Sequence, residues 1–183
     1  MEKGSIIILN GVSSAGKTTL AKVLQERLSH PYFHLDVDTF CLMAPQTFIV
    51  NDYSLQHDFA SNMYEVAKLF SDKKFNLVIT CVFLEGYGFL EKCTELLHDY
   101  PVCFVHVTCP IDELQRRELE RGNREIGSAE AMLPMLIPKH TYDITVDTYK
   151  NSVEKCADKI IEILDNTDNL TALKTLWKQM SSC

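Results

Sequence analysis

The start of the chain constrains its fold more than any other feature, because a strand, a glycine-containing segment and a helix follow one another there. Residues 5–10 form an apolar run that predicts a buried strand, and leucine and valine recur at helical spacing over residues 19–28. Between them, residues 11–18 read GVSSAGKT, and the two glycines permit backbone conformations that a side chain would block. This order predicts the first strand–helix unit of an α/β fold.

The same segment, residues 11–18, fits the pattern G-x-x-x-x-G-K-[ST]. In such a loop the backbone N–H groups and the positive end of the helix converge on phosphate oxygens, while Lys17 neutralises the β- and γ-phosphates and Thr18 binds Mg²⁺. An ordinary glycine- and serine-rich turn is the alternative, but the flanking strand and helix favour a nucleotide site. We therefore expect ATP and Mg²⁺ as cofactors. The loop residues expected to bind the nucleotide are Gly11, Val12, Ser13, Ser14, Ala15, Gly16, Lys17, Thr18 and Thr19.

Strand-like and helical patterns alternate along the rest of the chain, which is typical of a parallel sheet covered by helices. The segment 38–53 lacks regular periodicity and follows the carboxyl end of the second strand. Ligands of α/β sheets bind beyond such ends, so we predict that residues 38–53 bind the molecule that accepts the phosphoryl group. The later strands are predicted at 32–36, 76–83, 102–109 and 144–147, and the later helices at 55–71, 88–97, 110–121 and 153–164.

Length, charge and cysteine content exclude several classes of protein. The 183 residues, 46% of them hydrophobic, suit one domain over residues 1–183. A formal net charge of −7 argues against a general nucleic-acid binder. The seven cysteines are scattered without a C-x-x-C pair, which is typical of free thiols in a reducing cytoplasm. Because no signal-peptide pattern or membrane-length apolar run is present, we expect a cytoplasmic protein without a membrane partner, and its oligomeric state is left open.

Phosphoryl transfer also requires a group that orients or deprotonates the acceptor. Asp36 and Asp38 close the second predicted strand, and their alternation points both carboxylates to one side if the strand persists. We assign Asp38 as the general base and Asp36 to a water-mediated contact with Mg²⁺. The alternative is that these carboxylates only terminate the strand or cap the next segment. The nearby phosphate loop favours the catalytic role.

Four arginines lie close together after the fourth predicted strand: Arg116, Arg117, Arg121 and Arg124. A helix places Arg117 and Arg121 on one face, and Arg124 lies in a glycine-containing segment that suits a mobile loop. Because guanidinium groups bind phosphate oxygens through paired hydrogen bonds, we expect a lid at about residues 117–128. Arg117 then binds the nucleotide, and Arg121 and Arg124 take part in catalysis. The alternative is a solvated charged helix, in which the arginines pair with Glu113, Glu118 and Glu120. We favour this alternative for Arg116 alone.

Taken together, these motifs resemble the chloramphenicol phosphotransferase-like family, and the matches are spread over about residues 6–148. The resemblance implies a three-layer P-loop kinase fold with a five-stranded parallel sheet, helices on both faces and a short lid. The family's named member transfers the γ-phosphoryl group of ATP to a primary hydroxyl of chloramphenicol. The resemblance implies that Lys17 binds phosphate, that Thr18 binds Mg²⁺ and that Asp38 is the base. It matches Arg121 and Arg124 to the family's arginines on the nucleotide side. The segments that carry it are 8–17, 37–39, 82–86, 117–118, 121–124 and 142–148.

Two departures from the family's pattern concern the metal and the acceptor. Late in the third predicted strand the chain has Thr80 and Cys81 where the family has acidic residues. No carboxylate is therefore available there for water-mediated Mg²⁺ binding, and we expect Asp36 to take this role. The segment 131–138 is unusually apolar. Together with apolar residues after Asp38 it suits a flat, greasy acceptor, although such residues at helical spacing are more often core. The residues after Asp38 are Phe40, Met43 and Phe48.

These features favour an ATP-dependent phosphotransferase that acts on an alcohol hydroxyl of a small molecule, either chloramphenicol-like or another hydroxylated compound. A nucleoside, sugar-nucleotide or adenylylsulfate kinase is the main rival. Such an enzyme needs polar groups that recognise a base or a sulfate, and residues 38–53 offer only Gln46, Asn51 and Asp52. A non-catalytic ATP-sensing module is a further alternative, with a partner surface at residues 170–177. Packing of that segment against the sheet is the simpler explanation.

Overall fold

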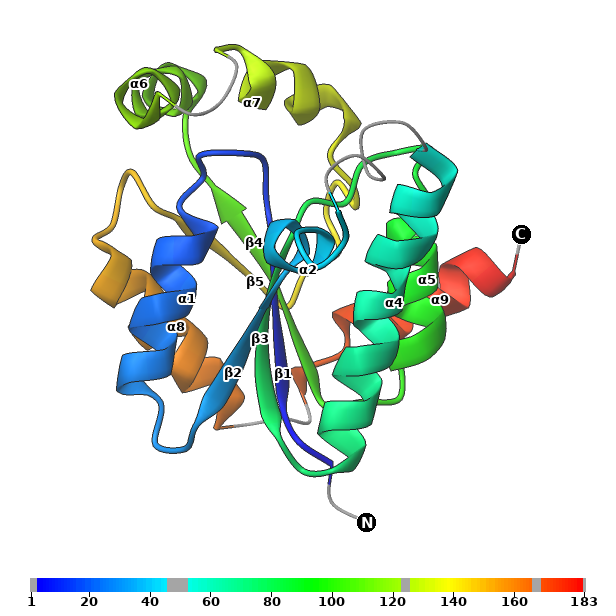
Figure 1. Cartoon of the computed structure of the whole chain (residues 1–183). Coiled ribbons are helices and arrows are strands. Elements are labelled where there is room, and N and C mark those ends of the chain that lie inside the picture. Colours follow the sequence, from blue (N-terminus) through cyan, green and yellow to red (C-terminus); the bar gives the residue numbers. More distant parts are fainter. Residues whose placement is uncertain (1–2, 46–52, 123–125, 166–168, 183) are drawn as a thin grey trace.

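The computed structural model describes residues 3–45, 53–122, 126–165 and 169–182. Within these ranges, five parallel strands form one sheet in the order β2-β3-β1-β4-β5 (Figure 1). The strands are β1 (Ile6–Asn10), β2 (Tyr32–Asp36), β3 (Asn76–Cys81), β4 (Val102–Thr108) and β5 (Ile144–Asp147). The predicted five-stranded parallel sheet is therefore confirmed.

Helices cover both faces of the sheet. α1 (Lys17–Arg27) and α8 (Val153–Leu164) lie on one face, and α4 (Tyr53–Asp72), α5 (Phe89–Leu97) and α9 (Ala172–Ser181) lie on the other (Figure 1). Three short or peripheral helices and one 3-10 turn lie at the carboxyl ends of the strands instead. These are α2 (Val37–Cys41), α6 (Ile111–Arg121), α7 (Ser128–Met132) and the 3-10 helix Leu133–Met135.

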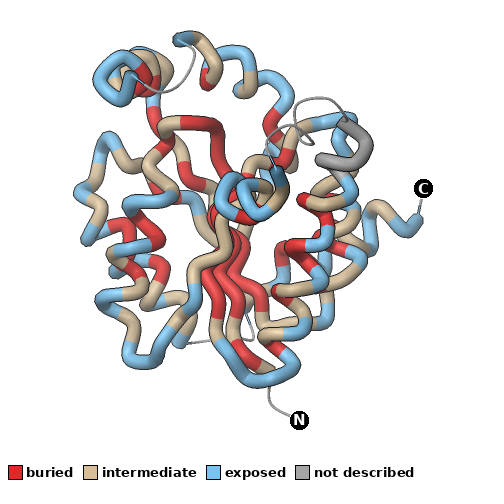
Figure 2. Tube along the Cα trace, in the orientation of Figure 1, coloured by how far each residue is buried: buried red, intermediate tan, exposed pale blue. Residues whose placement is uncertain are grey.

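The core consists of two apolar clusters separated by the sheet. Successive residues of β1 point to opposite faces, so Ile7 and Leu9 pack on the side of α1 and α8, while Ile6 and Ile8 pack on the side of α4, α5 and α9. All four are fully buried, and Figure 2 shows burial concentrated along the central strands. A continuous apolar run is what a strand covered on both faces requires.

The C-terminal helix α9 belongs to this packing. Leu173 and Leu176 are buried in the second cluster, and the Trp177 ring stacks on His98 of the α5 end at 3.9 Å between ring centroids. The simpler expectation for residues 170–177, packing against the parent fold, is confirmed. No helix of the described ranges is both long and apolar enough to cross a membrane.

One strand end, that of β3, differs by more than one residue from the sequence prediction. β3 ends at Cys81 instead of residue 83, because the Phe83 N–H donates to the side-chain oxygen of Asn10 at 2.9 Å instead of continuing the sheet. The Asn10 amide also donates to the Ile137 carbonyl and the Tyr142 hydroxyl, both at 2.8 Å. This fully buried asparagine thereby ties the end of β1 to segments far along the chain.

Candidate active site

The loop between β1 and α1 is shaped by its glycines and its lysine. A Cβ on Gly11 would lie 2.3 Å from the Val107 carbonyl oxygen, so only glycine fits there. Gly16 adopts φ +92° at the N-terminus of α1, a conformation that favours glycine. The Lys17 ammonium donates to the carbonyl oxygens of Gly11 and Val12 at 2.7 and 2.9 Å, which holds this charge at the loop.

Two serines of the loop show that it fits a phosphate group. The hydroxyl oxygens of Ser13 and Ser14 are buried, and neither has a hydrogen-bond partner among the described residues. Ser14 also adopts φ +60°, which is uncommon for a residue other than glycine. Buried hydroxyls without partners are costly, and phosphate oxygens next to a helix N-terminus would satisfy them.

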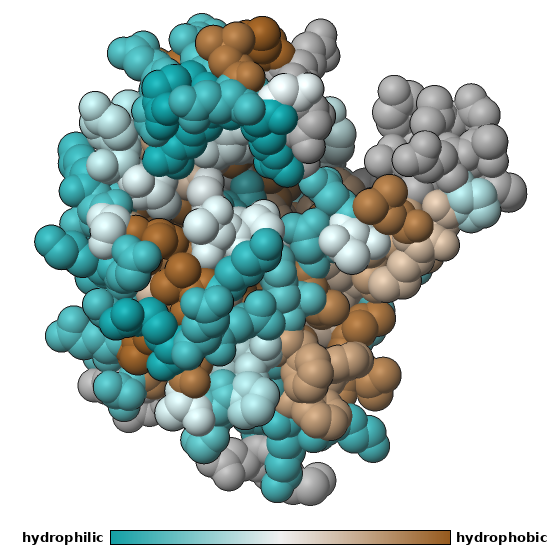
Figure 3. All heavy atoms as spheres, turned by 60° about the vertical axis from the view of Figure 1, so that its left-hand side comes forward, coloured by the Kyte–Doolittle hydropathy of each residue, from teal (hydrophilic) through white to brown (hydrophobic). Residues whose placement is uncertain are grey.

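A cavity of about 980 Å³ lies at the carboxyl ends of the strands, between the loop, α2, β3 and α6. Figure 3 shows a hollow in the upper part of the molecule, beneath hydrophilic side chains in the region of α6. Gly11, Val12 and Ala15 are buried in the loop and do not line the cavity, and Arg124 lies outside the described residues. The predicted site residues that do line it are Ser13, Ser14, Gly16, Lys17, Thr18, Thr19, Asp36, Asp38, Arg117 and Arg121.

The two aspartates after β2 reach this cavity from different elements. The expectation that the strand persists through Asp38 is wrong, because β2 ends at Asp36 and α2 begins at Val37. Asp36 caps α2: its Oδ1 accepts a hydrogen bond from the Thr39 N–H at 3.1 Å. Asp38 lies in the first turn of α2 and is exposed. Both carboxylates thus line one cavity, Asp36 from the end of β2 and Asp38 from the first turn of α2.

Thr80 of β3 is a partner of Asp36 that the sequence did not reveal. The sheet register places Thr80 directly beside Asp36, and the Thr80 hydroxyl donates to Asp36 Oδ2. The His34 Nε2 atom lies 2.9 Å from the same hydroxyl oxygen. Burial lowers the pKa of His34 below its ordinary value, and the Asp36 charge opposes this shift.

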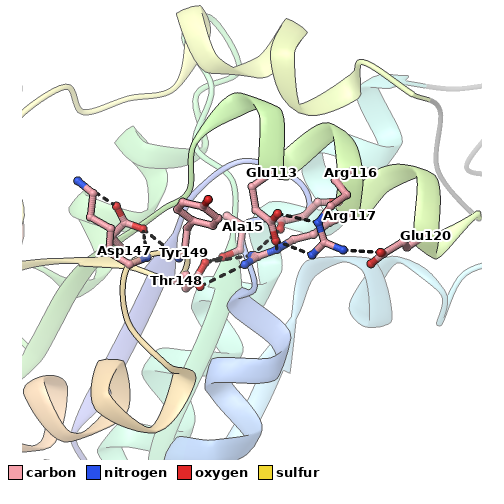
Figure 4. Close-up of polar contacts among 10 residues, drawn as sticks. Ala15, Glu113, Arg116, Arg117, Glu120, Asp147, Thr148 and Tyr149 are labelled. Atoms are coloured by element: carbon pink, nitrogen blue, oxygen red, sulfur yellow. Dashed lines mark hydrogen bonds and ion pairs between the residues drawn. The ribbon is translucent and has the colours of Figure 1, made fainter.

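Arg117 joins α6 to the loop (Figure 4). Its Nη1 donates to the Ser14 carbonyl at 3.3 Å and to the Thr148 hydroxyl at 3.0 Å, and its Nη2 donates to the Thr148 carbonyl at 3.1 Å. The Thr148 hydroxyl in turn donates to the Ala15 carbonyl at 2.9 Å. Arg117 is therefore positioned beside the segment that carries Ser13 and Ser14.

Acidic residues of α6 pair with its arginines, as expected for Arg116. Arg116 pairs with Glu113 and Glu120 on the solvent side, which confirms the solvated interpretation for this arginine (Figure 4). Hydrogen bonds from Arg116 and Arg117 lower the pKa of Glu113 to about 2. Arg121 ends α6 and lines the cavity.

A family model described as "Chloramphenicol phosphotransferase-like protein" matches residues 4–165. The chain belongs to this family. It is therefore a P-loop phosphotransferase, as the sequence predicted.

Individual relatives carry different names. A protein of Clostridium acetobutylicum named "Adenylyl-sulfate kinase" is 29% identical over 175 residues, covering 89% of this chain and 84% of its own. A Mycobacterium tuberculosis protein named "Putative O-phosphotransferase" is 25% identical over 187 residues, covering 88% and 83%.

Solved structures share the fold at lower identity. The M. tuberculosis APS kinase, in complex with AMPPNP and APS, has a TM-score of 0.71 and is 18% identical. The comparison covers 91% of this chain and 100% of the APS kinase chain. The shikimate kinase of Acinetobacter baumannii, in complex with shikimate, has a TM-score of 0.64 and 20% identity, covering 90% and 96%. These likenesses establish the P-loop kinase fold.

In this chloramphenicol phosphotransferase-like chain, Glu118 has a role that the sequence did not reveal. We considered it as a partner for the arginines, but its fully buried carboxylate accepts hydrogen bonds from the Gly127 and Ala129 N–H groups at 2.9 and 2.8 Å. Glu118 therefore caps α7 and links it to α6.

Apolar and aromatic residues also line the cavity. Tyr64 of α4, Phe89 of α5 and Met132 of α7 line it, together with Val37 and Val82. Burial raises the pKa of the Tyr64 hydroxyl well above its ordinary value, so this group stays protonated at neutral pH.

Of the three apolar residues expected after Asp38, the two that the structure describes do not line the cavity. Phe40 is buried and packs against Phe59 at 5.0 Å between ring centroids, so it belongs to the core. Met43 is exposed and does not line the cavity. Phe48 lies outside the described residues, as does much of the predicted acceptor-binding segment. Tyr64 and Phe89 were missed because they come from helices distant in sequence from Asp38.

Proposed function

We propose that this phosphotransferase moves the γ-phosphoryl group of ATP to an alcohol hydroxyl of a small molecule. The observation that carries the proposal is the shared cavity, which is lined by Lys17 and Thr18 of the phosphate loop and by Asp38. A phosphate cradle and a carboxylate facing one space are the parts that in-line transfer to a hydroxyl requires. We also propose that residues 1–183 act as one domain with residues 117–128 as its lid.

The chain's own residues divide the work. The loop N–H groups and Lys17 hold the phosphates, and Asp38 accepts the proton of the attacking hydroxyl. Arg117 and Arg121, with Arg124 beyond the described residues, bring positive charge to the phosphate oxygens. Thr18 and Asp36 would hold Mg²⁺, which when bound neutralises charge that develops on the phosphates.

The charge of the acceptor side restricts the acceptor. Residues 28–67 and 75–91, which include Asp38, Tyr64 and Phe89, contain no lysine or arginine. The described cations that line the cavity come from α1 and α6, on the phosphate side. An anionic acceptor would lose its hydration there without gaining an ion pair. We infer an acceptor without an anionic group, whose apolar or aromatic body contacts Tyr64, Phe89 and Met132. Chloramphenicol is one compound of this kind.

An adenylyl-sulfate kinase is the second candidate, favoured by the name of the relative from C. acetobutylicum. Its acceptor carries a phosphate and a sulfate, both of which call for cationic or multiple N–H donors. Residues 28–67 and 75–91 supply no cationic side chain. The first candidate predicts an uncharged acceptor and the second an anionic one, so one acceptor assay distinguishes them.

The test measures ATP consumption against a panel of acceptors. The panel contains chloramphenicol, other uncharged aromatic alcohols, nucleosides and adenylyl sulfate, and each product is checked by mass spectrometry for a gained phosphoryl group. We expect an uncharged hydroxyl compound to stimulate ADP release and adenylyl sulfate to fail. Stimulation by adenylyl sulfate alone supports the second candidate, and stimulation by no compound contradicts both.

Two aspartate variants separate a kinase from a nucleotide sensor. Asp38→Asn should lower kcat about 10²- to 10⁴-fold while leaving ATP affinity unchanged, because a general base acts only on the acceptor. Asp112→Asn is the matched control: it changes an exposed aspartate in the first turn of another helix, α6, that does not line the cavity. Equal turnover of both variants would contradict the role of Asp38.

A further inference from the structure

The Asp36 carboxylate is held by two donors on two different oxygens. Its Oδ1 accepts from the Thr39 backbone, and its Oδ2 accepts from the Thr80 hydroxyl. One donor alone would leave the carboxylate free to rotate about its terminal bond. Two donors fix its plane, and Asp36 lines the same cavity as Thr18 and Lys17.

The direction of the bonds at Thr80 follows from counting hydrogens. A threonine hydroxyl has one hydrogen, and the carboxylate of Asp36 can only accept. Thr80 therefore donates to Asp36, and its oxygen accepts from His34, whose Nε2 must carry a proton. The chain of donors runs from His34 through Thr80 to Asp36, which polarises the hydroxyl toward the carboxylate.

Thr80 is almost completely buried, with 2% of its surface exposed, at the end of a strand whose other residues are mostly apolar. Valine has nearly the same shape and suits a buried strand at least as well. Packing therefore does not require a hydroxyl here. The hydroxyl instead makes two polar contacts, one with His34 and one with Asp36, and valine would remove both.

We propose that Thr80 is a positioning residue, whose hydroxyl, supported by His34, orients Asp36 toward the Mg²⁺ that accompanies the nucleotide. The carboxylate for this metal then comes from β2, and β3 supplies the hydroxyl that holds it in place. This inference rests on the proposed function, because it requires a nucleotide with Mg²⁺ in the cavity. It explains how the site works without an acidic residue at Thr80 or Cys81.

The test measures metal affinity directly, with Mn²⁺ as a spectroscopic substitute for Mg²⁺. ADP affinity is first measured by calorimetry in EDTA, and Mn²⁺ is then titrated into the protein–ADP complex and followed by the EPR signal of the free ion. Replacing a group that orients a metal-supporting carboxylate typically weakens the metal 10- to 100-fold, so we expect Thr80→Val to weaken Mn²⁺ on the order of tenfold. ADP affinity in EDTA should not change.

Three further variants distinguish positioning from general stability. Thr80→Ser keeps the hydroxyl and should restore most of the Mn²⁺ affinity. Asp36→Asn should weaken Mn²⁺ at least as much as Thr80→Val, and the double variant should be no weaker than Asp36→Asn, because Thr80 acts through Asp36. The matched control is Thr94→Val, which removes a buried hydroxyl of α5 that donates to Glu91 away from the cavity.

The outcomes separate this inference from the proposed function. If Thr80→Val binds ADP and Mn²⁺ as the unaltered protein does, the inference is wrong and the proposed function stands. If Thr80→Ser is as weak as Thr80→Val, or Thr94→Val is equally weak, the effect is structural and the inference is again wrong. If the unaltered protein binds no ADP at all, the proposed function is contradicted, and the inference with it.

Discussion

Replacing Glu118 by glutamine should measurably destabilise the protein, although the two side chains have nearly the same shape. The buried carboxylate accepts from two backbone N–H groups, those of Gly127 and Ala129. Glutamine keeps one acceptor oxygen but presents an NH₂ group to the other N–H. The cost is one hydrogen bond to a charged acceptor and one unsatisfied buried donor, together about 3 kcal/mol. For a chain of this length that corresponds to a fall in Tm of roughly 6–12 °C.

The matched control is Glu120→Gln on the same helix. Glu120 is exposed and pairs with Arg116 on the surface, so its replacement should cost less than about 1 kcal/mol. Thermal unfolding followed by circular dichroism compares the three proteins, and hydrogen exchange at Gly127 and Ala129 reports the cap itself. Faster exchange at these two amides in Glu118→Gln would accompany the lower Tm.

A result that would refute this reasoning is a Glu118→Gln protein that unfolds at the same temperature as Glu120→Gln, with unchanged exchange at Ala129. The carboxylate would then not hold α7. Because α7 carries Met132 to the cavity, the account of how this wall is positioned would fail as well.

Two other perturbations have expected outcomes. Gly11→Ala places a Cβ 2.3 Å from the Val107 carbonyl oxygen and should lower the free energy of unfolding, measured by chemical denaturation, by at least about 2 kcal/mol. Gly122→Ala, with φ +64° but no neighbour within 4 Å, should lower it by about 1 kcal/mol. Equal losses in the two variants would argue against the close approach at Gly11. Glu113 has its pKa lowered to about 2 by two guanidinium groups, so its stabilising contribution is complete above its ordinary pKa of 4.5 and is lost as pH falls toward 2. The Tm difference between the unaltered protein and Glu113→Gln should therefore shrink over that interval, and a constant difference would contradict the assignment.

The regular elements could be predicted because their periodicity is local. β2, β5 and α8 begin and end at the residues that apolar spacing indicates, namely 32–36, 144–147 and 153–164. Local patterns report which face a residue presents, and burial on both faces of β1 makes its run continuous. The phosphate loop was predictable for the same reason, since strand, glycines and helix are adjacent in sequence.

The partners of the site residues could not be predicted, because they come from distant segments. Asp36 meets Thr80 only through the β2–β3 register, and Asn10 meets Ile137 and Tyr142 across most of the chain. Asp38 was assigned correctly to the cavity for an incorrect reason: a helix beginning at Val37, and not a continued strand, turns it there. The sequence offers helix capping and a site role for Asp36 as alternatives, whereas in the structure Asp36 both caps α2 and lines the cavity.

The most direct test of the central claim is a calorimetric titration of the protein with ATP and Mg²⁺. The account predicts saturable binding that ADP competes for, and loss of that binding in Lys17→Met, whose ammonium lies at the loop. Lys174→Met, on α9 and outside the cavity lining, should bind as the unaltered protein does. A titration of the unaltered protein that gives no binding, or binding that Lys17→Met retains in full, would contradict the claim that this loop holds the nucleotide.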